Sequence, residues 1–111
     1  MKITVALLAA LLLSPAMAND ITTPEATVHR YLIERSFPAG ALDGLDAATK
    51  EKVNANNASL GVRWLHSYAN ADKTKTFCVY EGPSEAAVRE AAMLNALPVD
   101  SVMEIPVDLS P

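Results

Sequence analysis

The segment VRWLHSYANADKTKTFCVYEGP, residues 62–83, decides the fold of this chain. Two runs rich in aromatic and β-branched residues, 62–68 and 76–81, flank the polar residues 70–74. This pattern is typical of two antiparallel strands joined by a short turn. The segment also holds the chain's only cysteine, its only tryptophan and one of its two histidines, so the predicted hairpin is the first place to look for a site.

The residues on either side of the hairpin predict two helices and two more strands. Apolar residues recur every three or four positions before Gly61, and Ser84 and Pro98 supply a start and a stop for a second helix. The predicted elements are, in order, a strand at 27–35, a helix at 42–60, strands at 62–68 and 76–81, a helix at 84–97 and a strand at 101–107.

The predicted order is βαββαβ, which is the order of the ferredoxin-like α+β fold. That fold has an antiparallel four-stranded sheet with two helices on one face. The strands carry apolar residues on both faces, since Leu32 neighbours Ile33 and Trp64 neighbours Leu65. Two helices cover only one face, so we expect a second subunit or a ligand on the other.

The N-terminal residues predict a secretory signal. One basic residue, Lys2, precedes the apolar run 3–13, and Ala16-Met17-Ala18 supplies the small residues of a cleavage site. The run is much shorter than the roughly 20 apolar residues of a membrane span. We therefore predict a signal peptide at 1–18, a flexible leader at 19–26 and one domain at 27–111. The protein is expected to be secreted, most simply to a periplasm, with no membrane association after cleavage.

Charge and cysteine content exclude some classes of protein. Removal of Lys2 with the signal would change the formal net charge from −4 to −5, and no basic cluster follows. Such a surface argues against a nucleic-acid partner. Cys78 is the only cysteine, so no disulfide can form within the chain.

Four phrases resemble a family of small ferredoxin-like proteins of the nickel-binding type, a domain family of unknown function. They are LIERSFP, GVRWLHSY, FCVYEGPSEAAVREAA and LPVDSV, and the similarity runs over 31–107. The resemblance implies a homodimer with face-to-face sheets, as in dimeric α/β barrels.

The metal-binding branch of that family has one histidine at the end of the first strand and two histidines four residues apart on the second helix. In this chain the corresponding residues are Glu34 and Arg35 on the strand and Ala91 and Asn95 on the helix. The nickel ligands of that branch are therefore missing, and the chain resembles a different branch.

The hairpin could supply another site. A turn centred on Asp72 places His66 opposite Cys78, and both would share one side of the sheet with the aromatic residues. The predicted pairs are Arg63–Glu81, Trp64–Tyr80, Leu65–Val79 and His66–Cys78.

An imidazole beside a thiolate suits nickel, zinc or copper, with a third ligand from Glu34, Glu104 or a partner subunit. His66 and Cys78 are thus the candidate metal ligands. Two other readings stay open. In one, the same pair is only packed in an aromatic core. In the other, it forms a nucleophile and a base.

The sequence therefore predicts an exported, homodimeric protein that binds a small molecule or a metal ion and is not an enzyme. The expected ligand-binding residues are Glu34, Trp64, His66, Tyr68 and Tyr80. One alternative is a cofactor-independent isomerase or monooxygenase of the dimeric α/β-barrel type. The other is a structural or interaction module.

Overall fold

The computed structural model describes residues 27–111, so the predicted signal peptide and leader lie outside the described residues. The elements follow the predicted order, with one added turn of 3₁₀ helix, η2. They are β1 (His29–Ser36), η2 (Ala41–Gly44), α1 (Ala47–Ala58), β2 (Arg63–Ala69), β3 (Lys75–Gly82), α2 (Glu85–Leu94) and β4 (Ser101–Glu104).

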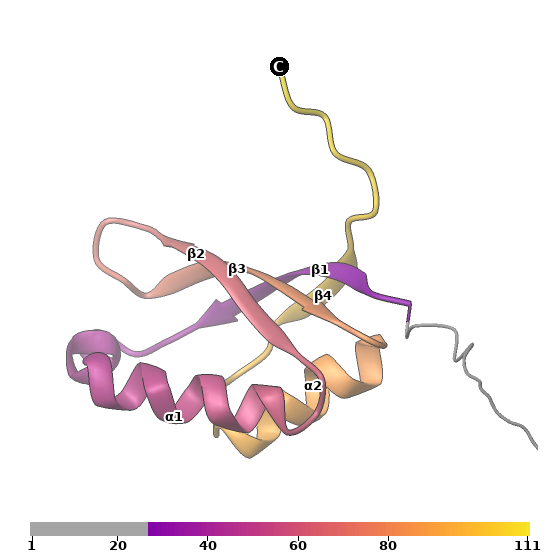
Figure 1. The fold of residues 1–111 in the computed structure, drawn as a ribbon. Coiled ribbons are helices and arrows are strands. Elements are labelled where there is room, and N and C mark those ends of the chain that lie inside the picture. The colour runs from indigo at the N-terminus through magenta and orange to yellow at the C-terminus, as the bar shows by residue number, and fades with distance from the viewer. Residues whose placement is uncertain (1–26) are drawn as a thin grey trace, which may run out of the picture.

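The four strands form one sheet in the order β2-β3-β1-β4, in which every neighbouring pair is antiparallel. Both helices lie on the same face of the sheet (Figure 1). The ferredoxin-like α+β prediction is therefore confirmed. The core between the layers consists mainly of Tyr31, Ile33, Val62, Tyr80 and Val88.

Side chains of the turn itself shape the tip of the hairpin. The Asn70 Oδ1 accepts hydrogen bonds from the backbone N–H groups of Thr74 and Lys75, at 3.0 and 2.9 Å. The Asp72 Oδ1 accepts one from the Thr74 hydroxyl at 2.6 Å. Asparagine and aspartate favour turns because their side chains bond to nearby backbone in this way. These side-chain hydrogen bonds close the turn, and no glycine occurs in residues 70–74.

The pairing of β2 with β3 follows the predicted register only over its first two pairs. Arg63 lies opposite Glu81, and Trp64 lies opposite Tyr80. The register then shifts between Trp64 and His66. A bulge of this kind gives one strand an extra residue and reverses the faces of the residues beyond it.

Beyond the bulge the predicted pairs are wrong. His66 lies opposite Val79, not Cys78, and Ser67 takes the position opposite Cys78. Leu65, the predicted partner of Val79, lies in the bulge. Consequently His66 and Cys78 point to opposite faces of the sheet.

Both helices are shorter than predicted. Asp46 caps α1 by accepting from the Thr49 N–H, so the helix begins after residues 41–44 have formed η2. The second helix ends at Leu94, because the N–H groups of Ala96 and Leu97 bond back to the carbonyls of Met93 and Ala92. This is the Schellman arrangement, with Ala96 in the left-handed conformation at φ 56°.

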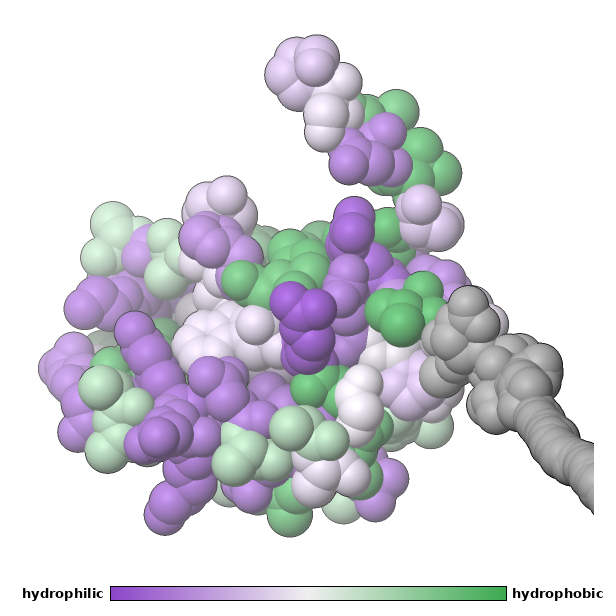
Figure 2. Space-filling view, viewed as in Figure 1, coloured by the Kyte–Doolittle hydropathy of each residue, from purple (hydrophilic) through white to green (hydrophobic). Residues whose placement is uncertain are grey.

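The face of the sheet away from the helices is open. It presents partly exposed apolar side chains, among them Leu32, Leu65, Phe77 and Val79. The C-terminal tail, residues 105–111, leaves β4 on the side of this face and extends beyond it (Figure 1). Its hydrophobic residues stand out in Figure 2, and Val107 and Leu109 are 70% and 87% exposed. Neither helix within 27–111 has the length and apolar character needed to cross a membrane.

Candidate functional site

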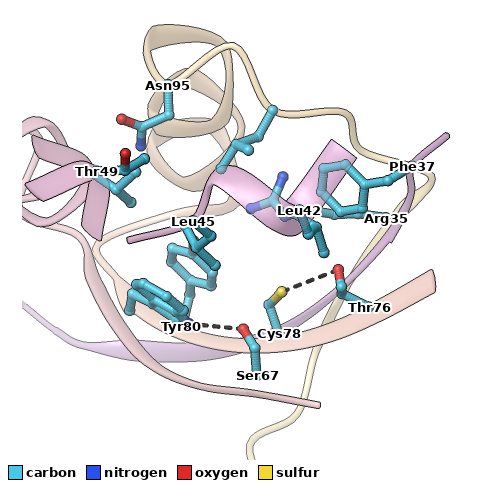
Figure 3. A pocket seen from close by; sticks show the side chains of 13 residues that line it. Arg35, Phe37, Leu42, Leu45, Thr49, Ser67, Thr76, Cys78, Tyr80 and Asn95 are labelled. Carbon is cyan, nitrogen blue, oxygen red and sulfur yellow. Dashed lines mark hydrogen bonds between the residues drawn. The ribbon is translucent and has the colours of Figure 1, made fainter. Parts of the chain in front are cut away.

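A cavity of about 150 Å³ lies between the helix-covered face of the sheet and the helices (Figure 3). Its wall is mostly apolar, with a smaller number of polar side chains. The apolar and aromatic residues are Phe37, Leu42, Leu45, Val53, Trp64, Tyr80 and Leu97, and the others are Arg35, Thr49, Ser67, Thr76, Cys78 and Asn95. A concave apolar site with a few polar groups is the usual form of a small-molecule site.

Strand alternation explains which residues of β3 reach the cavity. Thr76, Cys78 and Tyr80 are two residues apart and all are buried on the helix side. The Cys78 thiol lies 3.5 Å from the Thr76 hydroxyl, to which it can donate a weak hydrogen bond. Burial raises the pKa of the Tyr80 phenol, and the positive charge of Arg35 partly offsets that rise. Tyr80 is thus a neutral hydrogen-bonding group at neutral pH.

The bulge in β2 supplies the next wall. Trp64 and Ser67 are three residues apart and would lie on opposite faces of a regular strand. With the extra residue between them both face the cavity, and the indole N–H of Trp64 donates to the Ser67 hydroxyl at 2.8 Å. The bulge therefore brings a small hydroxyl into the wall and sends His66 to the open face.

Arg35 is the charged residue in the wall. Its side chain comes from the end of β1, and the residue is only 2% exposed. Its Nη1 donates to the carbonyl oxygen of Pro98 at 2.7 Å, and its guanidinium carbon lies 5.6 Å from the centre of the Tyr80 ring. Figure 3 shows the guanidinium turned toward the interior of the cavity.

Three asparagines form a polar network where α1 meets the end of α2. The Asn56 amide donates to Asn95, and the Asn95 amide donates to Asn57, both at 2.9 Å. Asn57 is 1% exposed, and its amide nitrogen has no hydrogen-bond partner within residues 27–111. This network fixes the Asn95 side chain at the edge of the cavity.

The structure divides the predicted ligand-binding residues between two places. Trp64 and Tyr80 line the cavity, and Cys78 lies beside them. His66 and Tyr68 lie on the open face, where their rings meet edge to face at 4.5 Å between centres. The prediction that Trp64, His66, Tyr68, Cys78 and Tyr80 share one side of the sheet is therefore wrong for His66 and Tyr68.

Glu34, the remaining predicted ligand residue, also lies away from the cavity. On β1 it alternates with Ile33 and Arg35, and its carboxylate is 3.6 Å from the Lys75 ammonium. It is thus part of a surface ion pair.

The residues described here do not form a metal site within one subunit. Across 27–111 there is no group of three or more histidine, cysteine, aspartate or glutamate side chains placed to hold a metal. The predicted pair His66 and Cys78 is separated by the sheet. His29 and Glu104 make a close pair at 2.8 Å, but no third ligand joins them. The residues therefore do not fit the nickel centre that the family resemblance implies.

Sequence reasoning missed most of the polar wall. Arg35, Thr76 and Ser67 were not among the predicted ligand residues, and neither was Asn95. One signal was present for Arg35, because it follows Tyr31 and Ile33 in steps of two and so belongs to the buried face of β1. Ser67 carried no such signal, since only the bulge turns it inward.

The topology and the cavity define a small ferredoxin-like α+β protein with a ligand-sized cavity between its layers. The sequence matches the family described as "Nickel responsive protein SCO4226-like" over residues 31–105, and the chain belongs to that family. A comparison with curated protein sequences finds no match.

One solved structure supports the fold. SCO4226 from Streptomyces coelicolor A3(2) superposes with a TM-score of 0.61 at 19% identity, covering 71% of this chain and 98% of its own. Protein YJCS, from a structural genomics study, gives a TM-score of 0.48 at 14% identity, covering 74% of this chain and all of its own. The second similarity is too low to add to the argument.

Proposed function

We propose that this chain is an exported, non-enzymatic protein that binds a small, mainly apolar molecule in the cavity between sheet and helices. The observation that carries the proposal is the cavity itself, about 150 Å³ with a predominantly apolar wall. An engineered cavity of about this volume in another protein binds benzene, so a single aromatic ring is a suitable size. Export rests on the N-terminal sequence alone.

We do not extend nickel binding from the family to this chain. The family description names a nickel response. In residues 27–111, however, no three potential ligands converge, and the buried cation of Arg35 in the cavity wall would repel a metal ion. A small molecule suits the donors present better than a metal does.

Tryptophan fluorescence provides a direct test. Trp64 is the only tryptophan in the chain and lines the cavity, so a ligand bound there should change its emission. We expect one-ring aromatic probes, neutral or anionic, to change this emission saturably and to raise the melting temperature. No saturable binding by any such probe would refute the proposal.

Two phenylalanine substitutions on one helix test the location. Val53 lines the cavity from α1, whereas Ala55 is exposed on the same helix and takes no part in the wall. Val53→Phe should fill the cavity and weaken probe binding, while Ala55→Phe should leave it unchanged. Equal binding by both variants would place the ligand elsewhere.

We further propose that the protein works as a homodimer in which a second copy covers the open face. Arg30, Leu65, His66 and Val79 on that face border one hollow with the tail residues Val107 and Leu109. A tail that projects apolar side chains, next to an apolar face that lacks a cover, suits a twofold arrangement in which each tail packs on the partner's face.

Light scattering can test the dimer with two matched lysine substitutions. Val79 lies at the centre of the open face, between Leu32 and His66, and Val79→Lys should give a monomer. Met93 is 79% exposed on α2, which packs on the other face, so Met93→Lys should remain dimeric. A monomeric native protein would refute this part of the proposal.

A further inference from the structure

We infer that the cavity binds a compact aromatic carboxylate, and that Arg35 is the residue that pairs with its negative charge. This inference rests on the proposed function and names the class of ligand.

Arg35 is a buried charge without a counter-ion in the described part of the chain. The residue is 2% exposed and takes part in none of the ion pairs found within residues 27–111. Within residues 27–111 its guanidinium donates to a neutral carbonyl, that of Pro98, and lies against the Tyr80 ring, although it has five N–H donors. Burying an unpaired charge is costly, so an anion that enters the cavity would be strongly favoured.

Thr76 places a hydroxyl-bearing side chain next to Arg35 in the sheet. Arg35 and Thr76 are directly opposite each other on β1 and β3, and both face the cavity. Side chains in such a pair are about 5 Å apart at their Cβ atoms. The Thr76 hydroxyl accepts from Cys78 and so keeps its own proton to donate. A carboxylate could therefore bind the guanidinium with one oxygen and Thr76 with the other.

The charges that line the cavity and the hollow next to it are positive. A second hollow shares Leu42, Leu45 and Trp64 with the cavity, and its lining includes Lys50 and Lys73. No aspartate or glutamate of the described chain lines either hollow, although the protein carries a net charge of −4. The local excess of positive charge would attract an anion toward the cavity.

Two acidic residues that are next to wall residues in the sequence, Asp46 beside Leu45 and Asp72 beside Lys73, make local hydrogen bonds. Asp46 accepts from the Thr49 N–H as the cap of α1, and Asp72 accepts from Thr74 in the hairpin turn. Neither forms an ion pair with Arg35. The apolar body of the wall favours an aromatic carboxylate over inorganic phosphate, which has no apolar part to bury and is more costly to desolvate.

A pair of probes of equal shape tests the inference on the native protein. Phenylacetate and phenylacetamide differ in charge but hardly in size. Titration followed by Trp64 emission at neutral pH should give at least about tenfold tighter binding of the acid, because a charge-assisted bond is roughly twice as strong as a neutral one. Equal affinities, or binding of phosphate in preference to phenylacetate, would overturn the inference and leave the proposed function standing.

Two arginine variants then test the residue. Arg35→Met should lose the preference for the acid while it keeps binding phenylacetamide, and its ligand-free melting temperature should rise because an unpaired buried charge is gone. Arg63→Met is the matched control, since it removes the same charge from a side chain that is 76% exposed on the same sheet. It should leave both affinities unchanged.

The outcomes separate the two claims. An unchanged preference for the acid in Arg35→Met would overturn the assignment of Arg35. Absence of binding by both probes to the native protein would instead refute the proposed function. If Arg35→Met does not fold, the comparison of the two probes on the native protein decides the inference alone.

Discussion

The two faces of the sheet are built from the same strands, but they differ in whether their charged side chains have oppositely charged neighbours. On the open face, where water is available, charged side chains lie close to partners: Arg30 is 3.5 Å from Glu81, and Lys75 is 3.6 Å from Glu34. On the covered face, where water cannot screen a charge, Arg35 has no oppositely charged partner among the described residues. Folding alone would favour an apolar residue there.

The comparison shows that the burial of a charged side chain and the presence of an oppositely charged partner are separate properties of a position. Surface ion pairs such as those of the open face contribute little to stability. A buried cation without a counter-ion, such as Arg35 on the covered face, is instead expected to reduce stability. A costly group that stands in a ligand-sized cavity is most simply explained by a role in binding.

The largest expected difference between the faces concerns two neighbouring residues of β1. Ile33 is fully buried under the helices, so Ile33→Ala should cost about 2–5 kcal/mol of unfolding free energy. Leu32 lies next to it on the open face and is only partly buried, so Leu32→Ala should cost less. Urea unfolding measures both.

Protein concentration sharpens that comparison. If a second copy covers the open face, the cost of Leu32→Ala should grow with concentration, because a dimer is stabilised by mass action. The cost of Ile33→Ala should change little. A larger cost for Leu32→Ala than for Ile33→Ala in dilute solution would contradict the distinction between the faces.

The next effect concerns space between the sheet and α2. A Cβ at Gly82 would lie 3.2 Å from methyl groups of both Val62 and Val88, so Gly82→Ala should destabilise by about 1–3 kcal/mol. Gly44 has nothing within 4 Å of such a Cβ, and Gly44→Ala serves as the control. Equal melting temperatures for the two variants would show that the layers have room to separate.

A smaller effect concerns the cap of the covering helix. The Ser84 hydroxyl accepts from the Ala87 N–H at 3.1 Å, so Ser84→Ala should cost about 1 kcal/mol. The Ser59 hydroxyl donates to an exposed carbonyl at the end of α1, and Ser59→Ala should change stability by less than about 0.5 kcal/mol. Thermal unfolding of the two variants makes the comparison, and a greater loss in Ser59→Ala would contradict it.

The smallest effect is a dependence on pH. Hydrogen bonds from Thr49 hold the pKa of the Asp46 carboxyl below its ordinary value. Its contribution is therefore fully present above the unfolded pKa, about 4, and is lost as the pH falls through the lower folded pKa.

A variant without that titration tests the sign. Asp46→Asn can still accept a hydrogen bond but does not ionise, so it should be less stable than the native protein at neutral pH. The difference in melting temperature should shrink as the pH falls from about 5 to about 2. A difference that is constant over this range would contradict the role given to the carboxylate.

Local patterns were sufficient to predict the order of the helices and strands but not all of their ends, since the strand predicted at 101–107 ends at Glu104. The aromatic and β-branched runs at 62–68 and 76–81 became β2 and β3 with shifts of one residue at most at their ends. Gly61 did follow the first helix and has a left-handed φ of 72°. Pro98 predicted the end of the second helix less accurately, because the helix ends at Leu94 and Ala96 already has a left-handed conformation.

The candidate site was predicted only in part. Trp64, Tyr80 and Cys78 were correctly grouped, since they lie before the bulge or on the regular strand. His66 was placed wrongly, because one extra residue in a strand reverses every face beyond it. Arg35 was not expected in the cavity, because an arginine at a strand end is more often exposed.

The sequence by itself determined the order of elements and the apolar character of both sheet faces, because both follow from residue types and periods along a single segment. Only the tertiary structure decided the register past Trp64, the pairing of Arg35 with a neutral carbonyl, and the cavity between the layers. These features depend on which side chains from distant segments fill the same space. Packing of that kind is a property of the assembled layers and leaves no period in the chain.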